Sequence, residues 1–469
     1  MPRDGAAATA VPSIDATKSP LAAPYVDVAR RIRDASLASD RAFERLGYLT
    51  DKIGPRLSGS TALEHAVQWA RDCFVADGQA NVTLEPVQVP HWVRGAASAT
   101  VVTPVQRTLS LLALGGSVAT APQGLTAPVM VVGSFDELES RKAEAKGKIV
   151  LFDHPMASQG SAGRNYGEAL PYRTTGAMRA APLGARAVLV RSLTARSLGS
   201  PHTGYMRYPD PPMADVPKIP AAAISVEDAE LLHRLVRRGD KPFVHLAMSP
   251  RMLPDAKSAN VLAEIPGRDL AQEVVVIGAH LDSWDVGQGA QDDGAGVVVV
   301  MEALATLRKL GLEPRRTIRA VLFTNEENGV HGAAQYEADH RDQLSHHVAA
   351  FEIDSGAGAP RGFMTDGDQP FLGQAREIAS LLAPVGADTV LPGFSGEDVS
   401  AMKPEKVPLF GVLLDGEHYF DVHHSVADTL DKIDPAQLRK TVAALATMAF
   451  VVADREDTWS TAPAPAAGR

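Results

Sequence analysis

The chain has 469 residues, of which 45% are hydrophobic and 22% charged, and this balance excludes a mainly disordered or collagen-like protein. Its formal net charge of −10 argues against a protein that coats nucleic acid or an anionic membrane, so neither is an expected partner. The single cysteine, Cys73, excludes a disulfide framework within the chain and a cysteine-rich zinc site.

The two ends of the chain have the composition of disordered tails. Residues 1–24 are rich in Ala, Pro and Ser, and residues 458–469 read the same way. The N-terminal stretch lacks the apolar run of a signal peptide, and no run of 18 apolar residues indicates a transmembrane helix. We expect a soluble protein, periplasmic or secreted if a leader was removed and otherwise cytoplasmic, so the compartment stays open.

Between the tails, the pattern of apolar residues along the chain changes twice. Residues 25–94 show helical spacing in VARRIRDASLASDRAFERLGYLTDKI and ALEHAVQWARDCFVADG, followed by the strand-like VTLEPVQVPHWV. Residues 95–255 carry short apolar runs between Gly/Pro-rich loops, including a long loop at 201–219, and predict a separate β-rich domain. At about 150 residues per domain, the length fits two or three domains.

Residues 256–457 alternate between apolar strands and helix-like segments. The strands are NVLAEIPG, VVVIGAHLD, TIRAVLFTNEE, HVAAFEIDS and VPLFGVLLD. This alternation predicts an α/β fold with a largely parallel sheet covered by helices on both faces. In such sheets the functional groups gather at the carboxyl ends of the strands.

Acidic and imidazole side chains stand at these predicted strand ends or in the loops that follow them. They are His280, Asp282 and Asp285, then Asp292 and Asp293, then Glu326 and Glu327, then Asp354, and finally His423 and His424. Neutral imidazole combined with carboxylate suits zinc, and also Mn²⁺ or Co²⁺. The set therefore predicts a metal site held by nitrogen and oxygen ligands.

Two metal ions about 3.5–4 Å apart need a bridging carboxylate. Asp292 is the natural bridge, because it lies in a Gly-rich loop where the backbone can approach closely. His280 with Asp354, and Glu327 with His424, would complete the two sites.

Two further carboxylates would serve those ligands. Glu326, next to a ligand but facing the other way, would act as general base, and Asp282 would orient the imidazole of His280. Each residue also has a structural interpretation. Asp292 and Asp293 could cap a helix, the Glu pair could be a charge cluster at a helix N-terminus, and the two histidines could be an exposed pair.

Four motifs in the right order, GAHLDSWDVGQGAQDDGAG, TNEENGVHGA, EIDSG and HHSVADT, resemble the co-catalytic zinc peptidases of family M28, in particular their carboxypeptidase Q-like branch. The resemblance covers at least residues 50–450. It implies a three-layer α/β/α zinc-peptidase domain, built from 25–94 and 256–457, with a mostly parallel mixed central sheet. It also implies a protease-associated domain inserted at 95–255 that covers the cleft, although a passive scaffold is an open alternative.

The resemblance assigns the same bridge, ligands and base as the residue chemistry. It selects His424 over His423 as the last ligand, because His424 lies four residues before Asp428. His423 occupies a position that is Tyr in many relatives, which implies a hydrogen-bond donor to the transition state, with a packing role as the alternative.

The implied activity is that of a zinc-dependent exopeptidase, a homodimer with two Zn²⁺ ions. It would hydrolyse dipeptides or short peptides with a free N-terminus by a metal-bridged water and Glu326. Asp398, or its neighbour Glu397, would bind the substrate amine, unless Asp398 only caps a helix. Three alternatives stay open: an amidohydrolase of N-acyl amino acids, a glutaminyl cyclase-like acyltransferase, and a non-catalytic binding module.

Overall fold

A computed structural model describes residues 14–208, 216–367 and 369–459. Residues 1–13 and 460–469 of the expected tails, and 209–215 of the expected long loop, lie outside the described residues. Residues 14–24 form turns and the short 3-10 helix η1 (Ala23–Tyr25) instead of a tail, because Ala22 is fully buried. At the other end Trp459 packs against Phe371, with ring centroids 4.4 Å apart.

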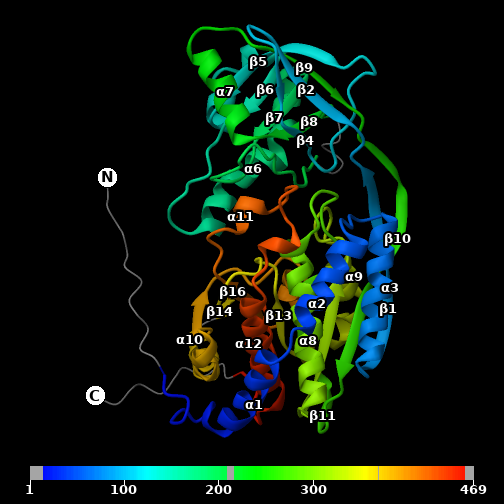
Figure 1. Cartoon of the computed structure of the whole chain (residues 1–469), viewed down its shortest axis with the longest axis vertical. Helices are drawn as coiled ribbons and strands as arrows, with labels where there is room; N and C mark the ends of the chain where they lie inside the picture. Colours follow the sequence, from blue (N-terminus) through cyan, green and yellow to red (C-terminus); the bar gives the residue numbers. More distant parts are fainter. Residues whose placement is uncertain (1–13, 209–215, 368, 460–469) are drawn as a thin grey trace.

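The strands form two eight-stranded mixed sheets (Figure 1). The first has the order β1-β10-β12-β11-β13-β16-β14-β15, and its central pairings β12–β11, β11–β13 and β13–β16 are parallel. Its strands are β1 (Ala80–Val93), β10 (Arg251–Ile265), β11 (Leu270–His280), β12 (Arg316–Phe323), β13 (His347–Glu352), β14 (Pro360–Thr365), β15 (Thr389–Pro392) and β16 (Leu409–Leu414).

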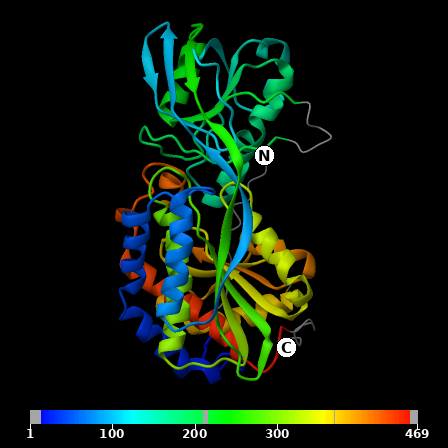
Figure 2. The same cartoon turned by 90° about the vertical axis from the view of Figure 1, so that its right-hand side faces the viewer.

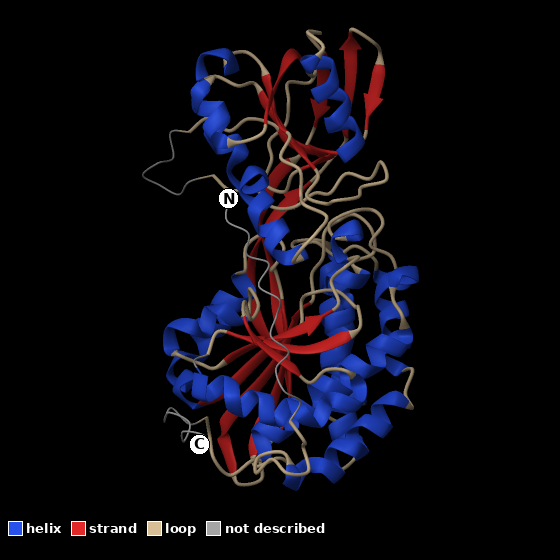
Figure 3. Ribbon diagram, turned by 90° about the vertical axis from the view of Figure 1, so that its left-hand side faces the viewer, coloured by secondary structure: helices blue, strands red, loops and turns tan. Residues whose placement is uncertain are grey.

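Helices pack on both faces of this first sheet, as the apolar strands predict (Figure 3). In β11, Val275 and Ile277 belong to one core cluster, whereas Val274 and Val276 belong to the cluster on the opposite face. The first cluster takes residues from α1 (Val26–Leu37), α2 (Arg41–Tyr48), α3 (Thr61–Ala76), α8 (Ala295–Lys309), α10 (Gln369–Ala379) and α12 (Pro435–Asp454); the second takes them from α9 (His331–His340), η5 (Arg341–His346) and η7 (Val399–Glu405).

The helix α12 is long and apolar enough to cross a membrane by length and composition. It is also a core helix, since 78% of its apolar window is buried. It packs against α8 and α1 in the first core cluster, so burial within the protein accounts for its composition.

Residues 97–248, called the insert unit below, form the second sheet, with the order β3-β2-β9-β5-β6-β7-β8-β4. Its strands are β2 (Ala97–Thr103), β3 (Arg107–Leu109), β4 (Leu111–Ala113), β5 (Leu125–Val132), β6 (Ile149–Phe152), β7 (Ala187–Arg191), β8 (Ala221–Ile224) and β9 (Phe243–Met248). The long antiparallel strands β1 and β10 connect the two sheets, and their last pair is Val93 with Arg251 (Figure 2).

The insert unit also contains helices, although its sequence pattern predicted a β-rich domain. They are α4 (Phe135–Ser140), α5 (Lys142–Ala145), α6 (Ala162–Ala180) and α7 (Val226–Arg237). The helix α6 holds several glycines and Pro171, which are poor helix formers and interrupt a helical pattern. Tertiary packing against β7 compensates for this weak propensity.

One end of α6 reaches the short helix α11 (Tyr419–Val422) of the other part of the molecule (Figure 1). The ring of Tyr166 stacks on Phe420 with centroids 4.6 Å apart. Nearby, Arg196 forms an ion pair with Asp421 at 3.1 Å. The insert unit therefore packs against the segment that leads into His423 and His424.

Candidate metal centre

The predicted site residues gather at the carboxyl edge of the first sheet. His280 is the last residue of β11, Glu326 and Glu327 follow β12, and Asp354 follows β13. Because these three strands are parallel neighbours, their carboxyl ends meet at one edge.

Asp292 reaches the same edge from the loop before α8. The carboxylate of Asp428 holds this loop by accepting hydrogen bonds from the backbone amides of residues 291 and 292, at 2.7 and 3.2 Å. The fully buried Arg56 braces the loop's far side by donating to the backbone oxygens of residues 281, 288 and 289. Asp293 is buried, and its carboxylate accepts a hydrogen bond from the backbone amide of His280 at 3.2 Å.

The carboxylate of Asp292 lies between two groups of imidazoles. Its Oδ1 is 3.2 Å from Nε2 of His280, and its Oδ2 is 3.2 Å from Nε2 of His424. One oxygen thus faces each group, which is the arrangement a bridging carboxylate needs.

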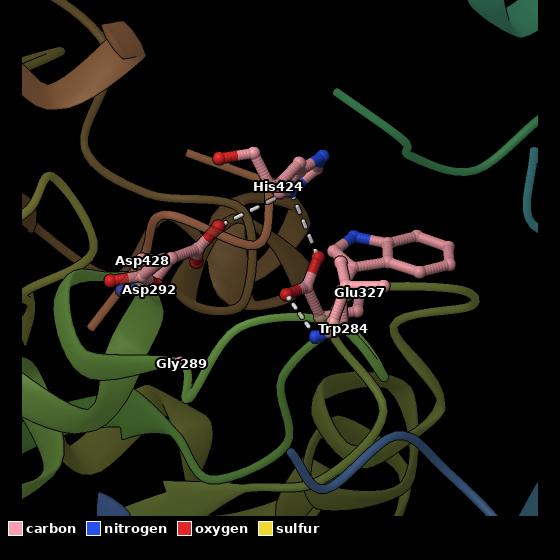
Figure 4. Close-up of a pocket in the computed structure, with 8 residues that line it drawn as sticks. Trp284, Gly289, Asp292, Glu327, His424 and Asp428 are labelled. Carbon is pink, nitrogen blue, oxygen red and sulfur yellow. Dashed lines mark hydrogen bonds and ion pairs between the residues drawn. The ribbon is translucent and has the colours of Figure 1, made fainter. Parts of the chain in front are cut away.

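A second carboxylate stands beside each imidazole. Asp354 Oδ1 lies 3.6 Å from Nε2 of His280, and Glu327 Oε2 lies 3.0 Å from Nε2 of His424. Figure 4 shows Glu327, His424 and Asp292 converging in a small pocket that Trp284 and Asp428 also line. The structure therefore brings together all five side chains that the sequence singled out as ligands.

His423 lies almost as close to the bridge as its neighbour. Its Nε2 is 3.4 Å from Asp292 Oδ2, and its ring stacks on that of His424 with centroids 3.6 Å apart. Asp292, His423 and His424 form one group with metal-ligand spacing, and His280, Asp292 and Asp354 form another. Only His424 of the two histidines also contacts Glu327, which favours it as the ligand.

The donor set fits a metal better than it fits a closed hydrogen-bond network. Nε2 of His280 and Oδ2 of Asp292 are buried and make no hydrogen bond in the described part of the chain. Nδ1 of His280 lies 3.0 Å from the backbone oxygen of Asp282, and an N–H donated there would leave the Nε2 lone pair for a metal ion. Buried polar atoms without partners are costly, and a divalent cation would satisfy both.

The electrostatics of the bridge differ from those of the two glutamates. Burial would raise the pKa of Asp292, but the adjacent imidazoles of His280 and His424 outweigh burial and hold this pKa well below its usual value. Burial, reinforced by the charge of Asp292, raises the pKa of Glu327 to about 7. Burial and the neighbouring Asp354 raise the pKa of Glu326 well above its usual value. Such a shift suits a group that must take up a proton.

Asp282 plays a different structural part from the one expected. Its carboxylate lies 3.8 Å from Nδ1 of His280, farther than its own backbone oxygen. The carboxylate instead accepts hydrogen bonds from the backbone amides of Glu326 and Glu327, at 3.0 and 3.3 Å. Because those two donors occupy it, Asp282 fixes the turn that aims the glutamates, and the main chain orients the imidazole.

The two candidates for amine binding differ in burial. Glu397 is exposed, whereas Asp398 is 1% exposed and neither of its carboxylate oxygens has a hydrogen-bond partner among the described residues. Asp398 precedes η7 but makes no capping hydrogen bond, so the helix-cap alternative is wrong. The backbone amides on either side of it bind Glu352, which holds the loop. Burial, then the charge of Glu352, raises the pKa of Asp398.

The insert unit supplies side chains that the sequence did not identify. Nη1 of Arg173, on α6, lies 3.3 Å from Nδ1 of His424. The backbone oxygen of Thr203 lies 3.2 Å from the same Nδ1. Tyr166 packs edge-on against His423, with ring centroids 5.2 Å apart. No local motif marks these residues, since each meets its partner across more than 200 positions.

Comparison with known sequences gives one family. The family described as "Peptidase family M28" matches residues 260–449. Carboxypeptidase Q of Bos taurus is 42% identical over 438 residues, which cover 93% of this chain and 90% of that protein. Carboxypeptidase Q of Homo sapiens is 43% identical over 434 residues, covering 92% of this chain and 90% of that protein.

Solved structures agree with the sequence comparison. The peptidase M28 precursor of Shewanella amazonensis has a TM-score of 0.89 at 35% identity, covering 94% of this chain and 99% of that one. The zinc aminopeptidase BSAP of Bacillus subtilis shares the fold, with a TM-score of 0.64 at 20% identity, covering 88% of this chain and 95% of that one.

Proposed function

The chain belongs to peptidase family M28, whose members are metallopeptidases, and from this premise we propose that it is a zinc-dependent exopeptidase acting on dipeptides or short peptides with a free N-terminus. The observation that carries the proposal is the position of Asp292, which faces His280 with one oxygen and His424 with the other. The relatives named carboxypeptidase Q support the exopeptidase class.

Five residues would hold two zinc ions: Asp292 between both, His280 and Asp354 on one side, and Glu327 and His424 on the other. Zinc bound there would supply Lewis-acid polarisation of the scissile carbonyl and would make a water molecule more acidic. Mn²⁺ and Co²⁺ suit the same donors.

Glu326 is placed to handle the proton. It is less buried than Glu327, and its backbone is fixed by Asp282. The side chain takes a proton from the attacking water as the new C–O bond forms, and gives it to the amine nitrogen as the C–N bond breaks. Its raised pKa favours the first transfer, because a group with a pKa closer to neutrality is a better proton acceptor.

His423 is our choice for a donor to the developing oxyanion. Burial, followed by the charge of His424, holds the pKa of His423 well below its usual value. The ring is therefore neutral near pH 7 and donates through a single N–H. A neutral donor contributes less than an imidazolium would, but it also carries no positive charge against the bound metal ions.

Asp398 would bind the ammonium group of the substrate. Its buried, unpartnered carboxylate requires a cation or a hydrogen-bond donor, and a free α-amine supplies both. An N-acyl group would remove the positive charge that this buried carboxylate would pair with. This observation favours free peptides over N-acyl amino acids.

We also interpret the insert unit as the protease-associated domain of this branch. The contacts of α6 with α11 and of Thr203 with His424 support a role in covering the cleft. A passive scaffold would not need to reach a metal ligand.

The test is hydrolysis of matched substrates: free dipeptides, their N-acetyl counterparts and aminoacyl amides, each with and without a chelator followed by zinc. Cleavage of free dipeptides that is lost with chelator and restored by zinc is the expected result. Preference for the acetylated series would favour the amidohydrolase, cyclisation of an N-terminal glutamine would favour the acyltransferase, and chelator-resistant cleavage would contradict the ligand set.

A further inference from the structure

Arg94 is a buried arginine at the junction between β1 and the insert unit, with 8% of its surface exposed. Its Nε donates to both carboxylate oxygens of Asp285, at 3.1 and 2.9 Å, and its Nη2 donates to the same carboxylate. Asp285 follows β11, as the sequence indicated, but it stands outside both groups with metal-ligand spacing. The ion pair with Arg94 therefore gives this carboxylate a partner other than a metal ion.

The rest of the guanidinium binds the insert unit. Nη1 of Arg94 donates to the hydroxyl of Thr203 at 3.0 Å and to the backbone oxygen of Ala113. The planar fork of an arginine holds several acceptors in a fixed geometry, which the single ammonium group of a lysine does not. Arg94 thus fastens the loop after β11 to two segments of the insert unit.

The neighbouring Trp284 belongs to the same junction. The guanidinium of Arg94 lies over the ring of Trp284, 5.6 Å from Cζ to the ring centroid, and over that of Trp92, at 5.0 Å. Although Trp284 comes from the loop after β11, its side chain is part of a core cluster made mostly of insert-unit residues. Gly115 of that unit packs so closely that a Cβ atom there would lie 2.2 Å from the indole. The insert unit therefore encloses Trp284.

The main chain of Trp284 carries this contact to the metal centre. Its backbone amide donates a hydrogen bond to Oε1 of Glu327 at 3.0 Å, and Oε2 of Glu327 lies 3.0 Å from Nε2 of His424 (Figure 4). One carboxylate oxygen is thus held by the backbone, and the other faces the second ligand of the same proposed zinc ion. A shift of residue 284 would turn this carboxylate.

We propose that Arg94 is a positioning residue for the metal ligand Glu327, and that it acts through Asp285 and Trp284. This inference rests on the proposed function, because it takes Glu327 as a zinc ligand. By holding the loop after β11 against the insert unit, Arg94 makes zinc binding by Glu327 and His424 depend on the position of that unit. Loss of an outer contact of this kind typically weakens metal binding about 10-fold to 100-fold.

The inference predicts an effect on one of the two zinc ions. His280 is held within the sheet by its pairing with Phe323, and Asp354 follows the neighbouring strand β13. The ion between these two ligands and the bridge should therefore be insensitive to Arg94. A residue that only stabilised the fold would not distinguish between the two ions.

The first test measures bound zinc by elemental analysis while a metal buffer sets the free zinc concentration. The wild type should hold two zinc ions per chain. Arg94→Gln should need about 10-fold to 100-fold more free zinc to fill one of them, with the other unchanged. Arg191→Gln is the matched control, because it breaks the buried pair with Asp153 in the insert unit and should bind zinc like the wild type. Asp285→Asn, at the partly exposed side of the ion pair, should weaken the same ion and takes over the test if Arg94→Gln does not fold.

The second test uses double variants to ask whether Arg94 acts through Glu327. Adding Arg94→Gln to Glu327→Gln should cause no further loss of zinc, whereas adding it to Asp354→Asn should weaken zinc on both sides. Further loss in the Glu327→Gln background, equal weakening of both ions, or wild-type zinc binding by Arg94→Gln would overturn the inference and leave the proposed function intact. A wild type that binds fewer than two zinc ions would overturn the proposed ligand set and this inference with it.

Discussion

The backbone oxygen of Thr203 lies 3.2 Å from Nδ1 of His424, although the two residues are 221 positions apart. An N–H of Nδ1 donated to this oxygen would leave Nε2 of His424, which faces Asp292 and Glu327, for a metal ion. A loop of the insert unit thus contacts a proposed metal ligand from the other part of the molecule.

The first prediction concerns this loop. The hydroxyl of Thr203 accepts a hydrogen bond from Arg94 at 3.0 Å and donates to the backbone oxygen of Ala113 at 2.9 Å. Thr203→Val removes both and should loosen His424, weakening zinc binding about 10-fold to 100-fold. Competition with a fluorescent chelator measures the affinity. Thr203→Ser, which keeps the hydroxyl, should bind zinc like the wild type; unchanged affinity in the valine variant would contradict the coupling.

The second prediction separates the two glutamates. Glu326→Gln should keep the wild-type zinc content and lower kcat about 1,000-fold, because it removes the proton acceptor but no ligand. Glu327→Gln should lose zinc, because Glu327 contacts His424 directly. Elemental analysis and turnover, measured on the same samples, check both. Substantial turnover by the Glu326 variant would show that the general base is another residue.

The third prediction concerns Asp398. Replacing it with Asn removes a buried carboxylate that burial and Glu352 destabilise, so the free energy of unfolding should rise by about 1 kcal/mol. The same change should raise KM for free dipeptides at least tenfold, since the ammonium group loses its partner. Denaturant titration and steady-state kinetics give the two values. Glu397→Gln, at the exposed neighbour, should change neither. An unaltered KM in Asp398→Asn would exclude the amine-binding role.

The fourth prediction concerns pH and His347, which lies outside the metal centre. Burial lowers the pKa of His347 from 6.5 to about 4, and its Nε2 lies 2.9 Å from the hydroxyl of Tyr336. Because the unfolded chain binds the proton more readily, neutral His347 makes its full contribution to the free energy of unfolding above pH 6.5. This contribution is lost as the pH falls toward 4, and the loss reaches up to about 3 kcal/mol.

Denaturant titrations at pH 7.5 and 4.5 test this pH dependence. His347→Gln should show a smaller loss of stability between these pH values than the wild type. His346→Gln, a change at the exposed neighbouring histidine, should retain the full loss. Identical pH dependence in all three proteins would contradict the assignment to His347.

The sequence was most informative about site residues that directly follow predicted strands. His280, Glu327 and Asp354 follow apolar strands, and parallel strands bring such positions to one edge, so their gathering could be predicted. Asp292 and His424 depended more on the resemblance to known motifs. Their loops fold through long-range contacts such as Asp428 with the backbone of residue 291, which periodicity does not reveal.

The insert unit was less predictable for a physical reason. Gly163, Gly167 and Pro171 weaken the helical pattern of α6, so this helix was missed. The position of Arg173 beside the site could not be predicted either, because its neighbour His424 lies 251 positions away in the sequence. For Asp282, the sequence predicted the location but not the hydrogen-bond partners. Sequence spacing placed it beside His280, but only the structure shows that two backbone amides occupy its carboxylate.

The pairing of Val93 with Arg251 puts both ends of the insert unit side by side on one ribbon. A short turn joining those two positions would close β1 and β10 into a hairpin and leave the register of the first sheet unchanged. The unit can therefore be gained, lost or exchanged in one piece during evolution. Such an exchange would replace Arg173 and Thr203, which both contact His424, while leaving Asp292 and Glu326 in place.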